Sequence, residues 1–199
     1  MKHVLVLVLA SLFASQALAE YDPNTPENRA ARAKYESMRN AAEQEAEKMA
    51  TTDVYNELER LDGLRSARIA LNPETFLAGT DDDQRGYGFS AVLSKRRDKG
   101  EVAASFYFGL QNWKYCQVQQ RLDTGQQWGN QIADCWRKTL DSFKVASAGQ
   151  IPAATFNIAR MYENGFGVIA SKYAAADWYV KSAEQYNKAS SRDEALRQD

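Results

Sequence analysis

Apolar residues recur three and four positions apart along most of the chain, and the alternation typical of strands is scarce. The first such pattern runs from residue 26 to about residue 50, where a thin apolar stripe lies opposite a strongly charged face. Further patterns cover residues 102–110 and 127–148, and a pair of them lies within residues 154–186. The spacing therefore predicts an all-α fold.

Cap and turn signals bound several of these helices. The segment Thr25–Glu27 combines a capping hydroxyl, a proline suited to the first helical position and early negative charge, so it predicts a helix start. Thr51–Asp53 predicts the start of a second helix that ends near Gly63, and Asn72–Glu74 predicts the start of a short third one. Gly86–Phe89 echoes a Gly-x-Gly turn near the end of the chain, although the helix that follows it is shorter.

The best-developed pattern is a helical hairpin over residues 154–186. Its two helices flank the tight turn Gly165–Val168, whose glycines permit backbone geometries that a Cβ makes costly. One face of the first helix carries Ala154, Ile158, Met161 and Tyr162. Ser171 is placed to cap the second helix. The inner face of that helix is predicted to hold Ala175, Trp178, Tyr179, Ser182, Ala183 and Tyr186. A lone hairpin cannot bury such faces, so neighbouring helices must stack on it.

The first nineteen residues have the pattern of a secretory signal. An apolar run, Val4–Phe13, is followed by the small-residue cleavage site Ala17–Ala19, so we expect the mature protein to begin at Glu20. The apolar run is too short for a membrane-spanning helix. Residues 1–19 are therefore excluded from the fold, and the mature protein is expected to be periplasmic or secreted, without membrane insertion.

Removal of this segment leaves the mature chain few chemical options. His3 is the only histidine, so the usual neutral-pH proton shuttle and the commonest nitrogen ligand for metals would both be absent. S-x-x-K, G-x-S-x-G, Walker and dinucleotide motifs are also absent after residue 19. Asp81–Asp83 resembles the start of a calcium loop, but Arg85 and Val92 stand where further ligands are needed. The sequence predicts no catalytic residue, no metal site and no cofactor.

Charge excludes another class of partner. Without Lys2, the chain has 24 basic and 26 acidic residues, a net charge of −2. Nucleic-acid-binding proteins normally carry a strong basic excess, so no nucleic acid is expected as a partner. The 180 residues that follow the signal segment suit one domain of ordinary size.

The two cysteines, Cys116 and Cys135, are predicted to form a structural disulfide. Their midpoint lies beside the last residue of Leu122–Gly125, a segment with the composition of a turn. In an antiparallel helical hairpin with that turn, the cysteines lie at the same height on facing helices, and their Cα atoms can approach as a disulfide requires. Export favours the bonded state. A redox pair is the less favoured alternative, because the spacing is not C-x-x-C.

The hairpin over residues 154–186 resembles the Sel-one-like repeat family, short relatives of the tetratricopeptide repeats. The residues that match the family pattern are Ala154, Tyr162, Gly165, Gly167, Val168, Ala175, Trp178, Tyr179, Lys181 and Ala183. The pattern's Leu-Gly, capping Asp, second Ala and closing Gly are replaced by Ile158-Ala159, Ser171, Ser182 and Tyr186. Residues 101–149 match as a degenerate copy with an extension that holds both cysteines, and residues 63–100 match only faintly.

The resemblance implies a short α-solenoid of helical hairpins over residues 63–199, with an N-terminal helical cap over residues 20–62. It also implies that the chain holds another protein and performs no chemistry of its own. The expected contact surfaces are the concave face of the stack and the tip around residues 113–131, where exposed aromatic residues would anchor a partner. The candidate partner-binding residues are Trp113, Tyr115 and Trp128, for which packing inside the hairpin is the alternative.

The identity of the partner stays open at this point. A protein-binding module is the leading hypothesis, and its partner would be a secreted effector or an envelope protein. Some exported relatives resemble immunity proteins that neutralise a secreted toxic effector such as a type VI phospholipase, which is the alternative. Others are linked to β-lactam binding or hydrolysis. That second alternative is disfavoured, because no motif supplies the activated nucleophile that such an enzyme needs.

Overall fold

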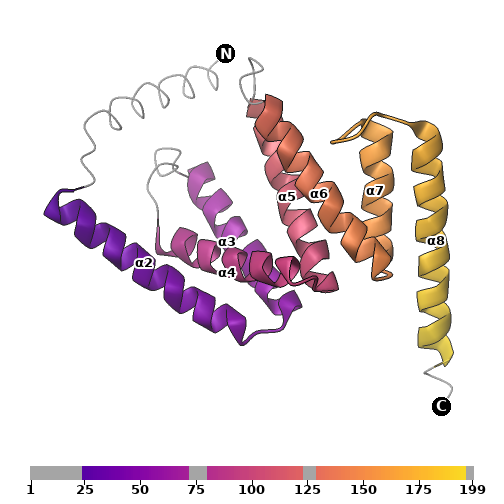
Figure 1. Ribbon diagram of the computed structural model, residues 1–199. Coiled ribbons are helices and arrows are strands. Elements are labelled where there is room, and N and C mark those ends of the chain that lie inside the picture. The colour runs from indigo at the N-terminus through magenta and orange to yellow at the C-terminus, as the bar shows by residue number, and fades with distance from the viewer. Residues whose placement is uncertain (1–23, 72–79, 123–128, 196–199) are drawn as a thin grey trace. The chain divides into compact units, whose positions relative to one another are not determined.

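The structure is a computed structural model that describes residues 24–71, 80–122 and 129–195, and within these ranges all regular elements are α-helices (Figure 1). The predicted all-α class is confirmed. The chain divides into two compact units between Val92 and Leu93. The boundary at residue 62 that the sequence predicts falls inside a helix. The signal segment and the short helix predicted at Asn72–Glu74 lie outside the described residues.

The first unit contains α2 (Pro26–Glu47), α3 (Thr51–Leu71) and the first part of α4 (Asp81–Asp98). The backbone N–H of Asn28 donates to Thr25 Oγ1 at 3.2 Å, which confirms the predicted cap of α2. The buried apolar residues of this unit are Ala42, Ala46, Val54, Leu58, Leu61, Phe89 and Val92.

Two glycine signals of the sequence lie inside helices of this unit. Gly63 lies inside α3, so the predicted helix end is not at this residue. Gly86 and Gly88 lie inside α4, so the segment that echoes the later Gly-x-Gly turn is helical. Gly88 has a packing reason for its missing side chain, since a Cβ there would lie 2.6 Å from the backbone oxygen of Arg39 on α2. The glycine permits close helix packing and does not mark a turn.

Charged residues also hold the three helices of the first unit together. Arg85 of α4 pairs with Glu45 of α2 at 2.9 Å and with Glu57 of α3 at 3.3 Å. Glu57 also accepts two hydrogen bonds from Arg60, each 2.7 Å long. The hydrogen bond from Arg60 lowers the pKa of Glu57, and partial burial opposes this effect.

We predict that this network makes the first unit sensitive to acid. A carboxyl whose pKa is lower in the folded state adds stability above its unfolded pKa, and that stability is lost as the pH falls through the folded pKa. On acidification from about pH 6 to about pH 3, the free energy of unfolding should therefore fall by about 1 kcal/mol more in the wild type than in Glu57→Gln. Urea titrations at both pH values measure this difference.

Glu36→Gln is the matched control, because Glu36 lies exposed on α2 and outside the network. Equal acid sensitivity in the wild type and in both variants would show that Glu57 contributes nothing to it.

The second unit contains the end of α4 and two consecutive helical hairpins (Figure 1). Its helices are α5 (Val102–Leu122), α6 (Gly129–Ala148), α7 (Pro152–Asn164) and α8 (Lys172–Ala195). α5 packs along α6, α6 along α7, and α7 along α8. The core consists of Trp113, Cys116, Trp136, Leu140, Phe143, Ala146, Ala154, Ile158 and Met161. Each inner helix is thus covered on two sides, whereas α7 is the main neighbour of α8.

The turn between α7 and α8 docks onto α6. Gly165 and Gly167 have φ values of +73° and +70°, which residues with a Cβ rarely adopt. Between them, the ring of Phe166 stacks on Trp136 with a centroid distance of 4.5 Å and an interplanar angle of 5°. The backbone N–H of Ala174 donates to Ser171 Oγ at 3.2 Å, so the predicted cap of α8 is confirmed.

A buried polar network sets which face of α8 turns inward. Thr155 Oγ1 lies 2.7 Å from Ser147 Oγ and donates to Oε1 of Gln185, whose Nε2 donates to the backbone oxygen of Ser147 at 3.0 Å. These bonds join α6, α7 and α8 and satisfy the buried amide. As a result Gln185 faces inward, and the sequence-based assignment of Ala183 and Tyr186 to the inner face is wrong, since both are exposed.

Candidate interaction surface

Trp113, a predicted partner-binding residue, belongs to the core. Its side chain is only 8% exposed and meets the ring of Trp136 edge-on at a centroid distance of 5.3 Å. The guanidinium of Arg160 covers it at 5.0 Å from the ring centroid. The expectation that Trp113 anchors a partner is therefore corrected, because the extended hairpin uses this large apolar ring to fill its interior.

The other two candidate partner-binding residues are Tyr115 and Trp128. Tyr115 is 57% exposed, and Val118, one helical turn further along α5, is 51% exposed. Both residues lie on the part of α5 that also carries Cys116. Trp128 lies outside the described residues, and of the two predicted anchors that the structure describes, only Tyr115 is at the surface.

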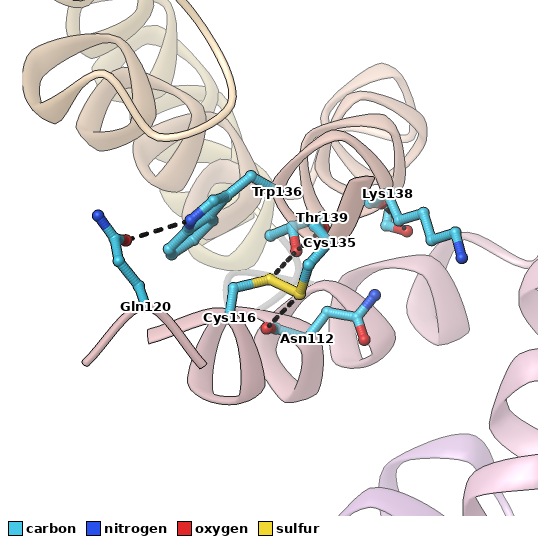
Figure 2. Close-up of a disulfide and its surroundings, with 8 residues drawn as sticks. Asn112, Cys116, Gln120, Cys135, Trp136, Lys138 and Thr139 are labelled. Carbon is cyan, nitrogen blue, oxygen red and sulfur yellow. Dashed lines mark hydrogen bonds between the residues drawn. A yellow bond between two sulfur atoms is a disulfide. The ribbon is translucent and has the colours of Figure 1, made fainter. Parts of the chain in front are cut away.

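The predicted disulfide is present and joins α5 to α6 (Figure 2). The Cα atoms of Cys116 and Cys135 are 5.8 Å apart. Thr139 Oγ1 lies 3.5 Å from Cys116 Sγ, and it donates to the backbone oxygen of Cys135 at 3.0 Å. Nearby, Trp136 Nε1 donates to Gln120 Oε1 at 3.3 Å, which adds a second link between the two helices. The disulfide and this hydrogen bond together brace the hairpin of α5 and α6.

The residues that match the repeat pattern in the sequence lie at folding positions of the second hairpin. Ala154 is fully buried, and Tyr162, Val168 and Trp178 pack against the core from partly buried positions. The hydroxyl of Tyr179 donates to Glu163 at 2.7 Å. Partial burial raises the pKa of Tyr179, and the hydrogen bond to the carboxylate adds to the effect. The phenol therefore acts as a neutral donor that ties α8 to α7.

An apolar stripe lies on the opposite side of α8. We call Tyr173, Ala176, Val180 and Ala183 the α8 stripe; they follow one another at intervals of three, four and three residues, and all are exposed. Tyr173 is 90% exposed, Val180 59%, and Ile169, just before the helix, 91%. With a rise of 1.5 Å per residue, the stripe is about 15 Å long. This is the largest run of exposed apolar side chains on one described helix of the second unit.

Acidic side chains border the α8 stripe along one edge. Asp177 and Glu184, which we call the acidic edge, lie four residues after Tyr173 and Val180 and are exposed. Within the described part of the chain, neither carboxylate has an ion-pair or hydrogen-bond partner. Lys181 does not neutralise them, because its Nζ turns to the Trp178 ring, 4.5 Å from the centroid. The positions next to the stripe on this side are therefore acidic, and Lys181 and Lys188 lie further around the helix.

Neither the α8 stripe nor its edge was found by sequence reasoning. The pattern of apolar residues assigned Ala183 to the interior, and it treated the last hairpin as a set of folding determinants. The usable signal was the 3-4-3 spacing of Tyr173, Ala176, Val180 and Ala183, which is the spacing of a helix-packing seam. A buried glutamine at residue 185 is what turns that seam outward.

The acidic residues that resemble the start of a calcium loop lie at the start of a helix. Asp81–Asp83 forms the first turn of α4, where Asp83 accepts hydrogen bonds from Thr80. Among the described residues, no group of His, Cys, Asp and Glu side chains is arranged to hold a metal ion. None of the described helices combines the length and the apolar character that crossing a bilayer requires.

Fold and surface together define an all-α protein with a disulfide-braced hairpin and an uncovered apolar helix face. Comparison of the chain with protein-family models, with curated proteins and with solved structures gave no match.

Proposed function

We propose that this chain is an exported helical-repeat protein of the Sel-one-like type that binds another protein through the α8 stripe and has no catalytic activity of its own. The observation that carries the proposal is the exposure of Tyr173 and Val180 on the outer face of α8. Contiguous apolar surface of this kind on a water-soluble protein marks an interaction site.

Stacking of the hairpins supports the repeat interpretation. The outer face of α6 is covered by α7, the first helix of the next hairpin, whereas α8 has α7 on one side and the exposed stripe on the other. Neighbouring units of a helical-repeat protein bury the apolar faces that they turn toward each other. The apolar face of α8, the last described helix, is therefore suited to a further helix from a partner.

Export is supported by two observations. The first is the secretory pattern of residues 1–19. The second is the disulfide, because such bonds persist in oxidising compartments and are rare where thiols are kept reduced. We propose a periplasmic or secreted location on these grounds.

A charge on the stripe should abolish the interaction. We expect Val180→Glu to reduce recovery of the cross-linked partner at least about fivefold, because it places an unpaired carboxylate in the centre of the contact. Chemical cross-linking in the producing cells, followed by mass spectrometry of the affinity-purified protein, measures the yield.

Val118→Glu is the matched control, since Val118 is a similarly exposed valine on α5. Melting curves of both variants establish that they fold. If Val180→Glu folds and recovers the same partner in the same yield as the wild type, the α8 stripe is not the binding surface.

A further inference from the structure

The inference rests on the proposed function and concerns the chemistry of the partner. We infer that the α8 stripe receives an amphipathic helix of another protein that carries Lys or Arg along one border of its apolar face. Three features of the second unit support this inference: the spacing of the stripe, the way the fold covers the equivalent face of α6, and the charge of the border.

The spacing of the stripe fits a helix as occupant. Tyr173, Ala176, Val180 and Ala183 alternate large and small side chains along about 15 Å of α8. The two alanines leave room for close approach of a second helix, and the two large residues insert between its side chains. Peptides that bind in this mode present anchors at i, i+3 and i+7, which matches the interval from Tyr173 to Val180.

Within the second unit, α6 shows how this fold covers a helix face of the same kind. α6 occupies the place in its hairpin that α8 occupies in the next one, and the face of α6 turned away from α5 is covered by α7. Trp136 and Phe143 on α6 lie in the core that results. A helix laid on the α8 stripe would continue the same stacking by one step.

The acidic edge selects a basic occupant. A helix seated on the stripe brings its flanking residues next to Asp177 and Glu184, which have no partner among the described residues. Acidic flanks would repel them, and Lys or Arg flanks would pair with them and steer the approach. Lys172, at the start of α8, lies on the opposite border, so the negative charge is confined to one side.

A second copy of the chain is a poorer occupant in the antiparallel orientation. Two-fold symmetry would then place the acidic edge of one copy against the acidic edge of the other. Like charges in that position oppose association. Self-association is therefore treated as an outcome that would overturn the inference.

Two stapled helical peptides test the inference. Both carry the same apolar seam of Leu and Ala over about three turns, and one has Lys flanks while the other has Glu flanks. Fluorescence anisotropy measures their binding to the mature protein with its disulfide intact. We expect the Lys peptide to bind about tenfold more tightly, with the advantage shrinking as salt is added.

Charge-exchange variants make the test specific. Asp177→Lys/Glu184→Lys should invert the preference so that the Glu peptide binds more tightly. Asp134→Lys/Asp141→Lys changes the net charge of the protein equally but acts on exposed carboxylates of α6, and it should keep the wild-type preference.

The remaining outcomes separate the inference from the proposed function. Equal binding of both peptides, lost in Val180→Glu, would keep the stripe as a binding surface and overturn the basic partner. A wild-type dimer in sedimentation that Val180→Glu dissociates would assign the stripe to a second copy. Absence of binding of both peptides to a monomeric protein would overturn the inference, whereas the proposed function is tested separately by the cross-linking yield of Val180→Glu.

Discussion

Replacing Gly167 with alanine is expected to lower the free energy of unfolding by about 3 kcal/mol. The residue has a φ of +70°, and a Cβ added to it would lie 2.7 Å from the Cβ and 3.0 Å from the carbonyl carbon of Trp136. The left-handed conformation costs a residue with a Cβ about 1–2 kcal/mol, and overpacking adds about 1–3 kcal/mol. Urea unfolding followed by tryptophan fluorescence measures the loss.

Gly165→Ala is the matched control for this prediction. Gly165 has almost the same φ, +73°, but its added Cβ would meet Ala170 Cβ at 3.3 Å, a milder contact. Both variants therefore carry the cost of the left-handed backbone conformation, and only the added Cβ of Gly167→Ala presses against the backbone of α6. Equal losses in the two variants would mean that the turn does not dock on Trp136 as described.

Removal of the disulfide is expected to have an effect of similar size. Cys116→Ala/Cys135→Ala should destabilise the second unit by about 3 kcal/mol, because the bond closes a loop of about 20 residues and so restricts the unfolded chain. For a unit of this size, the melting temperature should fall by about 10 °C or more. Calorimetry on the oxidised wild type and the double variant measures the shift.

A chemical control accompanies the melting experiment. The mature wild-type protein should react with a thiol-alkylating reagent only after denaturation and reduction, and its mass should then increase by two adducts, one for each of the two cysteines. Alkylation of denatured protein without reduction, or unchanged melting of the double variant, would contradict a structural disulfide.

Sequence reasoning succeeded where one local rule was sufficient. The caps at Thr25 and Ser171 require only a hydroxyl at the start of a helix, and both are present. The disulfide required only that two cysteines lie equally far from a turn between antiparallel helices. The buried faces of α7 followed from the spacing of Ala154, Ile158 and Met161.

It failed where tertiary contacts determine the role of a residue. Gly63 was interpreted as a helix-ending glycine and Gly88 as part of an echo of the later Gly-x-Gly turn, yet both lie inside helices, and Gly88 is explained by the close approach of α2. Trp113 was named as a candidate partner-binding residue with packing inside the hairpin as the alternative, because an aromatic residue near a loop can serve either role and only its neighbours decide.

The candidate binding surface was missed for a related reason. Polar residues are normally assigned to the outside of a helix, but Gln185 is buried because Thr155 and Ser147 satisfy its amide. Burial of Gln185 orients α8 so that Ala183 is exposed. No rule based on the sequence of α8 alone contains the hydrogen-bond partners on α6 and α7.

The most direct test of the account is site-specific photo-cross-linking in the producing cells. A photoreactive phenylalanine analogue replaces Tyr173 on the α8 stripe in one variant and Tyr115 on α5 in another, because both side chains are exposed. The account predicts a cross-linked product with a second protein at position 173 and none at position 115. A product at position 115 with none at position 173 would contradict the central claim that the α8 stripe is the binding surface.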